Sequence, residues 1–519
     1  MKIRAIYAAA AIVLTLGTIS LNAKTFEYWQ IHNMPKSIEK DYYIWRFLSQ
    51  STTTASEAKS IIQEASFLNK KLREVYRRKT GLAPHVQAAS APVRRKATEA
   101  EKQQWKANHQ KLQALKQGKL IAPAWVASTP QMECYLFNNC GHTIRKQRFD
   151  KLLSSKEYRL MTMDEKFDQS IRIILSEDLP KLRQSLMQPP AEGNLISPQT
   201  HFKLGLYALS QNKPKIALLY FGQARKKFTE RKDKDKANFW LYLVSKDKGY
   251  LKNLLNSYHV NMYTLAARDI MKMKYPKTIT PKLSPARIGH FNIQDPIHWA
   301  ALKEKLFSGR YNLQHLADEY KSDETIGPYT YIKAKASNFK ESYFPMPYRN
   351  IMKNLSPKRQ ALLYAIARQE SRFVPASVSR SFALGMMQIM PFLVEDIAMK
   401  KGEKIDLDEM FNPYKALDYA NFHLDYLTTY LYHPLFVAYA YNGGIGFTRN
   451  LITTQKYFRP GAYQPYLSME TIQNEEAKEY GKHVLTNYVI YMNKLGQPTR
   501  LLPFLESLTT PSKTDKFRQ

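Results

Sequence analysis

The chain of 519 residues has few of the residues that build metal sites or phosphate-binding loops: 2 cysteines, 12 histidines and 19 glycines. Two cysteines without a nearby pair of histidines cannot complete a tetrahedral zinc shell. The sequence also lacks zinc-finger spacing, a glycine-rich phosphate loop before a helix and an aromatic RNA-binding signature. No metal site is therefore expected.

Acidic residues are also scarce. There are 44 Asp and Glu against 78 Lys and Arg, which gives a formal net charge of +34. Such a charge indicates a polyanionic partner, which could be nucleic acid, an anionic membrane surface or an acidic wall polymer. Because the recognition motifs are missing, no nucleic-acid binding is expected. A lineage whose proteins are all basic is the alternative explanation.

Long hydrophobic runs are absent beyond the N-terminus. Lys2 and Arg4 precede an apolar stretch, and Ala23 ends a plausible cleavage site. This pattern predicts a secretory signal peptide at residues 1–23, with retention as an anchor as the alternative. In an exported protein, Cys134 and Cys140 favour a disulfide that closes a small loop. Two free, partly buried thiols are the other interpretation.

The remaining sequence has the periodicity of successive helices, which predicts an all-α fold. Its clearest unit is a helical hairpin with a first helix at 202–209, a turn at 211–214 and a second helix from Lys215. Small residues facing large ones across a short turn are typical of a solenoid. We predict an N-terminal helical superhelix (solenoid) at 24–340, a second α domain at 345–505 and a frayed polar tail at 506–519. A generic all-α interaction domain is the alternative for the first of these.

One carboxylate stands out in the second domain. Ser356 suits an N-cap and Pro357 suits the first helical position, so a helix is expected to start there. Glu370 lies on the same face as Leu363 and Ile366. Burial against apolar side chains raises the pKa of a carboxyl and yields a proton donor near neutral pH, as glycosidic cleavage requires. A structural or surface charge is the simpler interpretation of Glu370 alone.

Four sequence blocks around Glu370 give it a context. They are Glu370-Ser371, Gly385-Met386-Met387-Gln388-Ile389-Met390-Pro391, Ala440-Tyr441-Asn442-Gly443-Gly444, and Glu476 followed by Tyr480 and Val484. In this order they resemble the catalytic domain of the soluble lytic murein transglycosylases, the Slt family, whose fold is related to goose-type lysozyme. The stacked hairpins before them resemble the family's superhelix. Departures from the family pattern are Phe382, Leu384, Gly443 and Gly481.

The resemblance implies a periplasmic lyase with a lysozyme-like α domain, acting on the glycan strands of peptidoglycan. Glu370 would act as acid and then as base on the MurNAc-GlcNAc β-1,4 bond, and the product would end in 1,6-anhydromuramic acid. This chemistry would need no metal and no cofactor. The implied substrate-binding residues are Ser379, Gln388, Met390, Tyr441 and Glu476. Ser379 would bond an acetamido group, with a turn cap as the alternative, and the Tyr441 hydroxyl would lie near Glu370.

Most glycosidases use two carboxylates, but no Asp or Glu occurs between Glu370 and Glu395. Asp396, Asp406 and Asp418 are interpreted as solvated charges. A lysozyme-type hydrolase remains the first alternative, favoured if a second carboxylate lies near Glu370. A glycan-binding scaffold without turnover is the second. The protein is expected to be a monomer, and contacts with a membrane surface or with wall-synthesis proteins are left open.

Overall fold

The computed structural model of the chain describes residues 24–84, 98–119 and 129–519. The expected signal peptide at 1–23 lies outside these residues. Within them, the regular structure is 28 α-helices, two short 3-10 helices and one π-helical turn, with no β-strand, so the all-α prediction is confirmed. No helix in this part of the chain is long and apolar enough to cross a membrane.

The chain forms two compact units, which we describe separately and call the smaller and the larger unit. The smaller unit combines residues 24–84 with 289–310 and 374–422. Its helices are α1 (Tyr28–His32), α2 (Ile38–Ser49), α3 (Ala55–Ile61), η1 (Ile62–Glu64), α4 (Lys70–Thr80), α16 (Pro296–Phe307), α21 (Pro391–Lys401), η3 (Leu407–Phe411) and the first part of α22 (Pro413–Thr428).

Within the smaller unit, ion pairs join segments that are far apart in the sequence. The Arg46 guanidinium on α2 donates to Asp406 at 2.6 Å and to Asp408 at 3.0 Å, at the start of η3. Lys303 on α16 pairs with the buried Glu39 of α2 at 2.5 Å. Helix α2 is therefore the element on which both later segments of this unit pack.

The larger unit contains residues 98–119, 129–288, 311–373 and 423–519. Its first helices are α5 (Glu99–Lys116), α6 (Pro130–Asn139), α7 (His142–Ile144), η2 (Arg145–Phe149), α8 (Ser155–Met161), α9 (Phe167–Ser176), α10 (Pro180–Ser185), α11 (Pro198–Ser210), α12 (Pro214–Lys227), α13 (Arg231–Ser245), α14 (Gly249–Leu255) and α15 (Met262–Ile270). Its later helices are α17 (Leu313–Glu319), α18 (Ile326–Ala336), α19 (Arg349–Met352), α20 (Pro357–Glu370), α23 (Pro434–Gly443), α24 (Ile445–Thr453), α25 (Tyr466–Thr471), α26 (Glu475–Lys494), α27 (Leu502–Ser507) and α28 (Pro511–Thr514).

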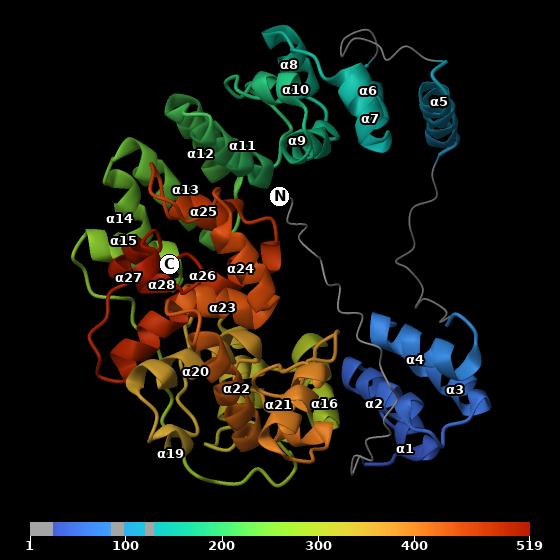
Figure 1. Cartoon of the computed structure of the whole chain (residues 1–519), viewed down its shortest axis with the longest axis vertical. Helices are drawn as coiled ribbons and strands as arrows, with labels where there is room; N and C mark the ends of the chain where they lie inside the picture. The colour runs from blue at the N-terminus through green and yellow to red at the C-terminus, as the bar shows by residue number, and fades with distance from the viewer. Residues whose placement is uncertain (1–23, 85–97, 120–128) are drawn as a thin grey trace, which may run out of the picture. The chain divides into compact units, whose positions relative to one another are not determined.

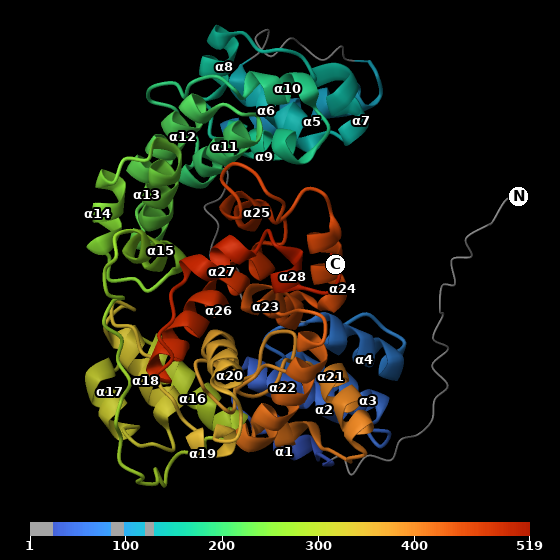
Figure 2. The ribbon, with the colours of Figure 1, turned by 60° about the vertical axis from the view of Figure 1, so that its left-hand side comes forward.

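The hairpin expected from the sequence is present as α11 and α12. A side-chain carbon on Gly205 would lie 2.5 Å from the Phe221 ring, so the two helices meet closely at a small residue facing a large one. Helices α12, α13, α14 and α15 then pack each on its predecessor (Figure 2). This succession has the pattern of a helical solenoid.

Three helices of the larger unit, α20, α23 and α26, lie side by side, with α26 packed on both others (Figure 1). The buried Tyr364 of α20 stacks on Tyr491 of α26 with ring centroids 5.1 Å apart. Arg368 donates to the Asn487 amide oxygen at 2.6 Å, and the Asn487 amide nitrogen donates back to the Ala365 carbonyl oxygen at 3.2 Å. These contacts fix the register between α20 and α26.

The expected disulfide is wrong, because Cys134 and Cys140 are free, buried thiols. Cys134 lies inside α6 and Cys140 caps its C-terminus. Six residues at about 100° each leave the two side chains about 120° apart around the helix axis. The Cys140 thiol donates instead to the Phe137 carbonyl oxygen at 3.4 Å.

The expectation of a frayed polar tail at 506–519 is also wrong. Arg518 forms a buried ion pair with Asp515 at 2.7 Å and donates to the Phe458 carbonyl oxygen at 2.9 Å. Asp515 also bridges to Leu431 through the backbone. The polar residues of this segment suggest a solvated tail, but in the packed structure they form hydrogen bonds and ion pairs with one another. The other predicted domain boundaries, at 24–340 and 345–505, stay predictions.

Candidate active site

Helix α20 carries Glu370 at its last position. It starts as the sequence predicts, with the Ser356 hydroxyl accepting from the Arg359 backbone N–H and Pro357 at the first turn. The residues from Ala361 to Ala367 are all buried, so α20 is a core helix. Its C-terminal end thus holds Glu370 half-buried beside the core.

Tyr480 of α26 is the hydrogen-bond donor to this carboxyl. Its Oη lies 2.7 Å from Glu370 Oε1. Burial raises the pKa of Glu370 from 4.5 to about 8, because desolvation penalises the charged form. The Tyr480 hydrogen bond acts against this rise, and the nearby charge of Glu476 adds to it. Glu370 therefore keeps its proton at neutral pH.

Tyr441 and Glu476 belong to the same neighbourhood in the larger unit. Tyr441 is near the end of α23, and its pKa is raised, first by burial and then by the charge of Glu370. Its ring meets the His423 ring edge-on at 5.7 Å. Glu476, in the first turn of α26, is exposed and accepts from the Asn442 side-chain amide at 3.4 Å. The structure thus brings Glu370, Tyr441 and Glu476 together.

Ser379 lies in the smaller unit, on the loop before α21. Its Oγ accepts from the Ala383 backbone N–H at 2.9 Å and from the Ser381 N–H at 3.2 Å. The hydroxyl therefore caps a turn, which is the alternative that the sequence left open. A contact between Ser379 and a substrate stays a prediction.

Gln388 and Met390 end the same loop. The Gln388 amide nitrogen donates to the carbonyl oxygens of Gly385 at 2.8 Å and Ser377 at 3.1 Å. Gly385 has φ +73°, and a side-chain carbon there would overlap the Met410 carbonyl oxygen. Met390 is half-buried and caps the N-terminus of α21. The block is thus a tightly folded loop held by its glycine and its glutamine.

The carboxylates that the sequence interpreted as solvated are in ion pairs of the smaller unit. Asp396 pairs with Lys400 at 2.6 Å, Asp418 with Lys401 at 3.0 Å, and Asp406 with Arg46. Across the described residues, no group of three or more His, Cys, Asp or Glu is placed to hold a metal ion.

Comparison with known proteins identifies the domain around this site. The model of the family described as the transglycosylase SLT domain matches residues 351–461. The chain carries a transglycosylase SLT domain. The match covers residues 351–461 of the 519, so it identifies this domain and not the whole chain. Among curated proteins, no sequence match is found.

The solved structures to which this chain is similar are lytic transglycosylases. An inactive mutant of the lytic transglycosylase Slt from Pseudomonas aeruginosa is 15% identical with a TM-score of 0.50, and the match covers 90% of this chain and 74% of that one. The 70 kDa soluble lytic transglycosylase from Escherichia coli is 15% identical with a TM-score of 0.48, covering 93% and 84% of the two chains. At this identity, the Pseudomonas structure shows similarity of fold alone.

The SLT domain match includes Glu370, Gln388 and Tyr441 but ends before α26. Tyr480 is the site residue that sequence reasoning did not select, although it was visible in the fourth block. Glu476 and Tyr480 are four residues apart, so they share one face of a helix. That spacing was the available signal that both side chains face the same site.

Proposed function

We propose that the protein is an exported lytic transglycosylase that cleaves the MurNAc-GlcNAc β-1,4 bond and leaves 1,6-anhydromuramoyl ends. The observation that carries the proposal is Glu370 itself, a half-buried carboxyl with a pKa of about 8 that receives a 2.7 Å hydrogen bond from Tyr480. Such a group can first donate a proton and then accept one at neutral pH.

In the first step, protonated Glu370 donates its proton to the glycosidic oxygen and the C1–O4 bond breaks. Positive charge develops on the muramoyl ring, and the neighbouring 2-acetamido oxygen stabilises it. Glu370 becomes an anion in a desolvated position, where ionisation is costly. The Tyr480 hydroxyl then donates a charge-assisted hydrogen bond to the new carboxylate, and this bond lowers the cost of the step.

In the second step, the ionised Glu370 takes the proton from the C6 hydroxyl of the same muramoyl residue. The C6 oxygen bonds to C1 and closes the 1,6-anhydro ring. Glu370 is protonated again, so the cycle ends in its starting state and consumes no water. The Tyr441 hydroxyl is proposed to orient the reacting ring, and Ser379, Gln388, Met390 and Glu476 are proposed to bind the glycan.

A lysozyme-type hydrolase is a second candidate because of one observation. The charge of Glu476 raises the pKa of Glu370, so a second carboxylate lies within electrostatic reach. Glu476 is exposed, where it could contact solvent water. A hydrolase would use this carboxylate to activate water and would produce reducing ends.

The deciding experiment is mass spectrometry of muropeptides released from purified sacculi. The wild type should release products lighter by one water than hydrolysed ends, and Glu370→Gln should release none. Asp396→Asn, which changes a half-buried carboxylate outside the site that pairs with Lys400, should behave as the wild type. Hydrolysed ends from the wild type would establish the hydrolase, and no release by the wild type would favour a binding scaffold.

Export is tested on the same chain in cells. Fractionation should find a product shortened by the signal peptide in the periplasm, and a variant that begins at residue 24 should stay in the cytoplasm. A mature product that retains its N-terminal segment at the membrane would replace export with anchoring.

A further inference from the structure

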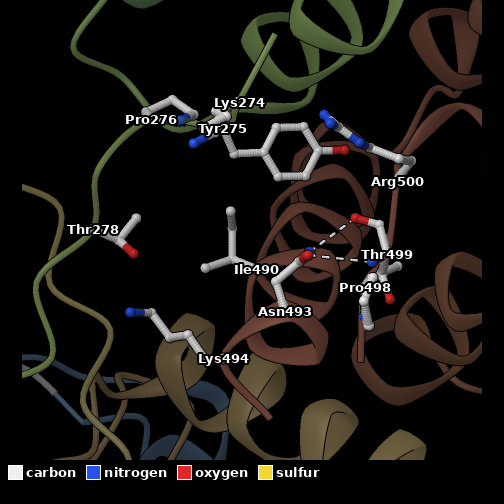
Figure 3. Close-up of a pocket in the computed structure, with 10 residues that line it drawn as sticks. All are labelled: Lys274, Tyr275, Pro276, Thr278, Ile490, Asn493, Lys494, Pro498, Thr499 and Arg500. Atoms are coloured by element: carbon white, nitrogen blue, oxygen red, sulfur yellow. Dashed lines mark hydrogen bonds between the residues drawn. The ribbon is translucent and has the colours of Figure 1, made fainter. Parts of the chain in front are cut away.

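A pocket of about 440 Å³ in the larger unit lies away from Glu370, at the C-terminal end of α26. One wall is the segment after α15, with Lys274, Tyr275, Pro276 and Thr278. The opposite wall is the last turn of α26 and the loop that follows, with Ile490, Asn493, Lys494, Pro498, Thr499 and Arg500 (Figure 3). Hydrogen bonds between Asn493 and Thr499 hold the loop against the helix.

The pocket is strongly cationic. Lys274, Lys494 and Arg500 line it, and none of its ten described residues is acidic. Arg500 forms an ion pair with Asp269 at 3.2 Å. The other carboxylate oxygen of Asp269 accepts from the Leu501 backbone N–H at 2.7 Å. In the described part of the chain, neither lysine forms an ion pair with a carboxylate. Two positive charges thus face the pocket uncompensated.

The surroundings of Lys494 that the structure describes are neutral or positively charged. Its ammonium donates to the Thr280 hydroxyl at 2.7 Å, which is a neutral partner. Burial lowers the pKa of Lys494, and the positive charge of Arg368 lowers it further. Arg368 stacks on the Phe344 ring at 3.7 Å and donates to neutral oxygens. An anion near Lys494 would therefore relieve repulsion between two cations.

A second cavity, of about 550 Å³, shows the contrast. It also has cations in its lining, including Lys203 and Lys478, but both of these pair with Glu475, at 3.5 Å and 2.5 Å. Asp168 and Glu470 add two more carboxylates to the same lining. Four cations and three carboxylates line it, so its charges are largely balanced, in contrast to the lining of the pocket at the end of α26.

The walls of the cationic pocket indicate which kind of anion fits. Pro276, Ile490, Pro498 and the Tyr275 ring provide apolar surface next to the ammonium groups. A compact, fully hydrated ion such as inorganic phosphate would leave this surface uncovered. A carboxylate joined to a small apolar side chain would meet both the cations and the apolar wall.

We propose that this pocket binds the C-terminal carboxylate of a peptide that ends in a small apolar residue, as the stem peptides of peptidoglycan can. The identification of this peptide as a peptidoglycan stem rests on the proposed function. Lys494 follows Tyr480 by 14 residues on α26, so the two are about 21 Å apart along the helix. A glycan strand at Glu370 carries further stems at this range, and the pocket would hold one of them.

The test is a binding measurement on the full chain by titration calorimetry. The probe is diacetyl-Lys-D-Ala-D-Ala, and its C-terminal amide serves as the uncharged control. The acid should bind and the amide should bind at least tenfold more weakly, since hydrogen bonds to charged groups dominate the site. Lys494→Met and Lys274→Gln should each lower the affinity for the acid about tenfold. Lys277→Gln, an exposed lysine of the same segment that does not line the pocket, should leave binding unchanged.

Three results would overturn the proposal: equal binding of the acid and the amide, unchanged affinity in both lysine variants, or displacement of the peptide by an equal concentration of inorganic phosphate. The measurement requires no turnover, so it is separate from the muropeptide analysis. A wild type that lyses sacculi but does not bind the acid refutes the pocket alone. A wild type that binds the acid but yields no anhydro ends refutes the proposed function alone.

Discussion

Removing the Tyr480 hydroxyl tests the role of Glu370 most directly. In Tyr480→Phe the ring remains, but the 2.7 Å hydrogen bond to Glu370 Oε1 is lost. That bond favours the ionised carboxylate, and it opposes a pKa already raised to about 8 by burial. The substitution should therefore raise the pKa of Glu370 further.

The size of the shift follows from the hydrogen bond. A hydrogen bond to a charged group contributes about 1.5–3 kcal/mol, and one pKa unit corresponds to about 1.36 kcal/mol. The full contribution would move the pKa by about one to two units. Glu370 is only half-buried, so water can replace part of the lost bond, and we expect about one unit.

The assay is the pH profile of kcat/KM for release of soluble muropeptides. Glu370 must be protonated to act as acid, so activity in the wild type should fall as pH rises through about 8. In Tyr480→Phe this descending limb should move about one unit higher, while kcat near neutral pH falls because the carboxylate is less stabilised. Tyr488→Phe, on the same helix but packed on Phe504, should change neither. A limb that stays in place or moves to lower pH in Tyr480→Phe would refute the reasoning.

Three further predictions follow from the same contacts. Glu370→Gln should raise the melting temperature over wild type more at pH 9 than at pH 5. The pKa of Glu370 is about 8 in the folded protein and 4.5 ordinarily, so the stability that the protonated carboxyl contributes is complete below pH 4.5 and is lost as pH rises through 8. A difference between the thermal melts that does not depend on pH would contradict this. Tyr441→Phe should lower turnover by about tenfold to a thousandfold, whereas an unchanged rate would make Tyr441 a packing residue. Gly385→Ala should destabilise the fold by about 1–3 kcal/mol, because the new carbon would overlap the Met410 carbonyl; an unchanged denaturation midpoint would contradict the close approach.

The features predictable from the sequence were those encoded locally. One helix is enough to predict the N-cap and the proline at the start of α20. One hairpin is enough to predict the contact of the small Gly205 with the large Phe221. The C-terminal tail was missed because its stability is not local. Arg518 and Asp515 have the composition of a solvated segment, and only contact with distant backbone at Phe458 and Leu431 makes them buried.

The same distinction applies to the site. Glu370 could be selected because its own helix places it on an apolar face. The residue that donates to it could not, because Tyr480 reaches Glu370 across a sequence separation of 110 residues. Sequence reasoning assigned a hydroxyl near Glu370 to Tyr441, whose pKa does respond to the charge of Glu370. The electrostatic neighbourhood was therefore predicted, whereas the specific hydrogen bond needed the packing of α20 on α26.

Two of the four departures from the family pattern, Gly481 and Phe382, have local steric reasons. Gly481 stands where valine is usual, and a side-chain carbon there would overlap the buried Tyr439 ring. Phe382 stands where glycine is usual and keeps the positive φ, +63°, that favours glycine. Its ring lies 5.7 Å from the Trp45 ring of α2, and this burial offsets the backbone cost. Both residues are thus explained by packing within their own unit.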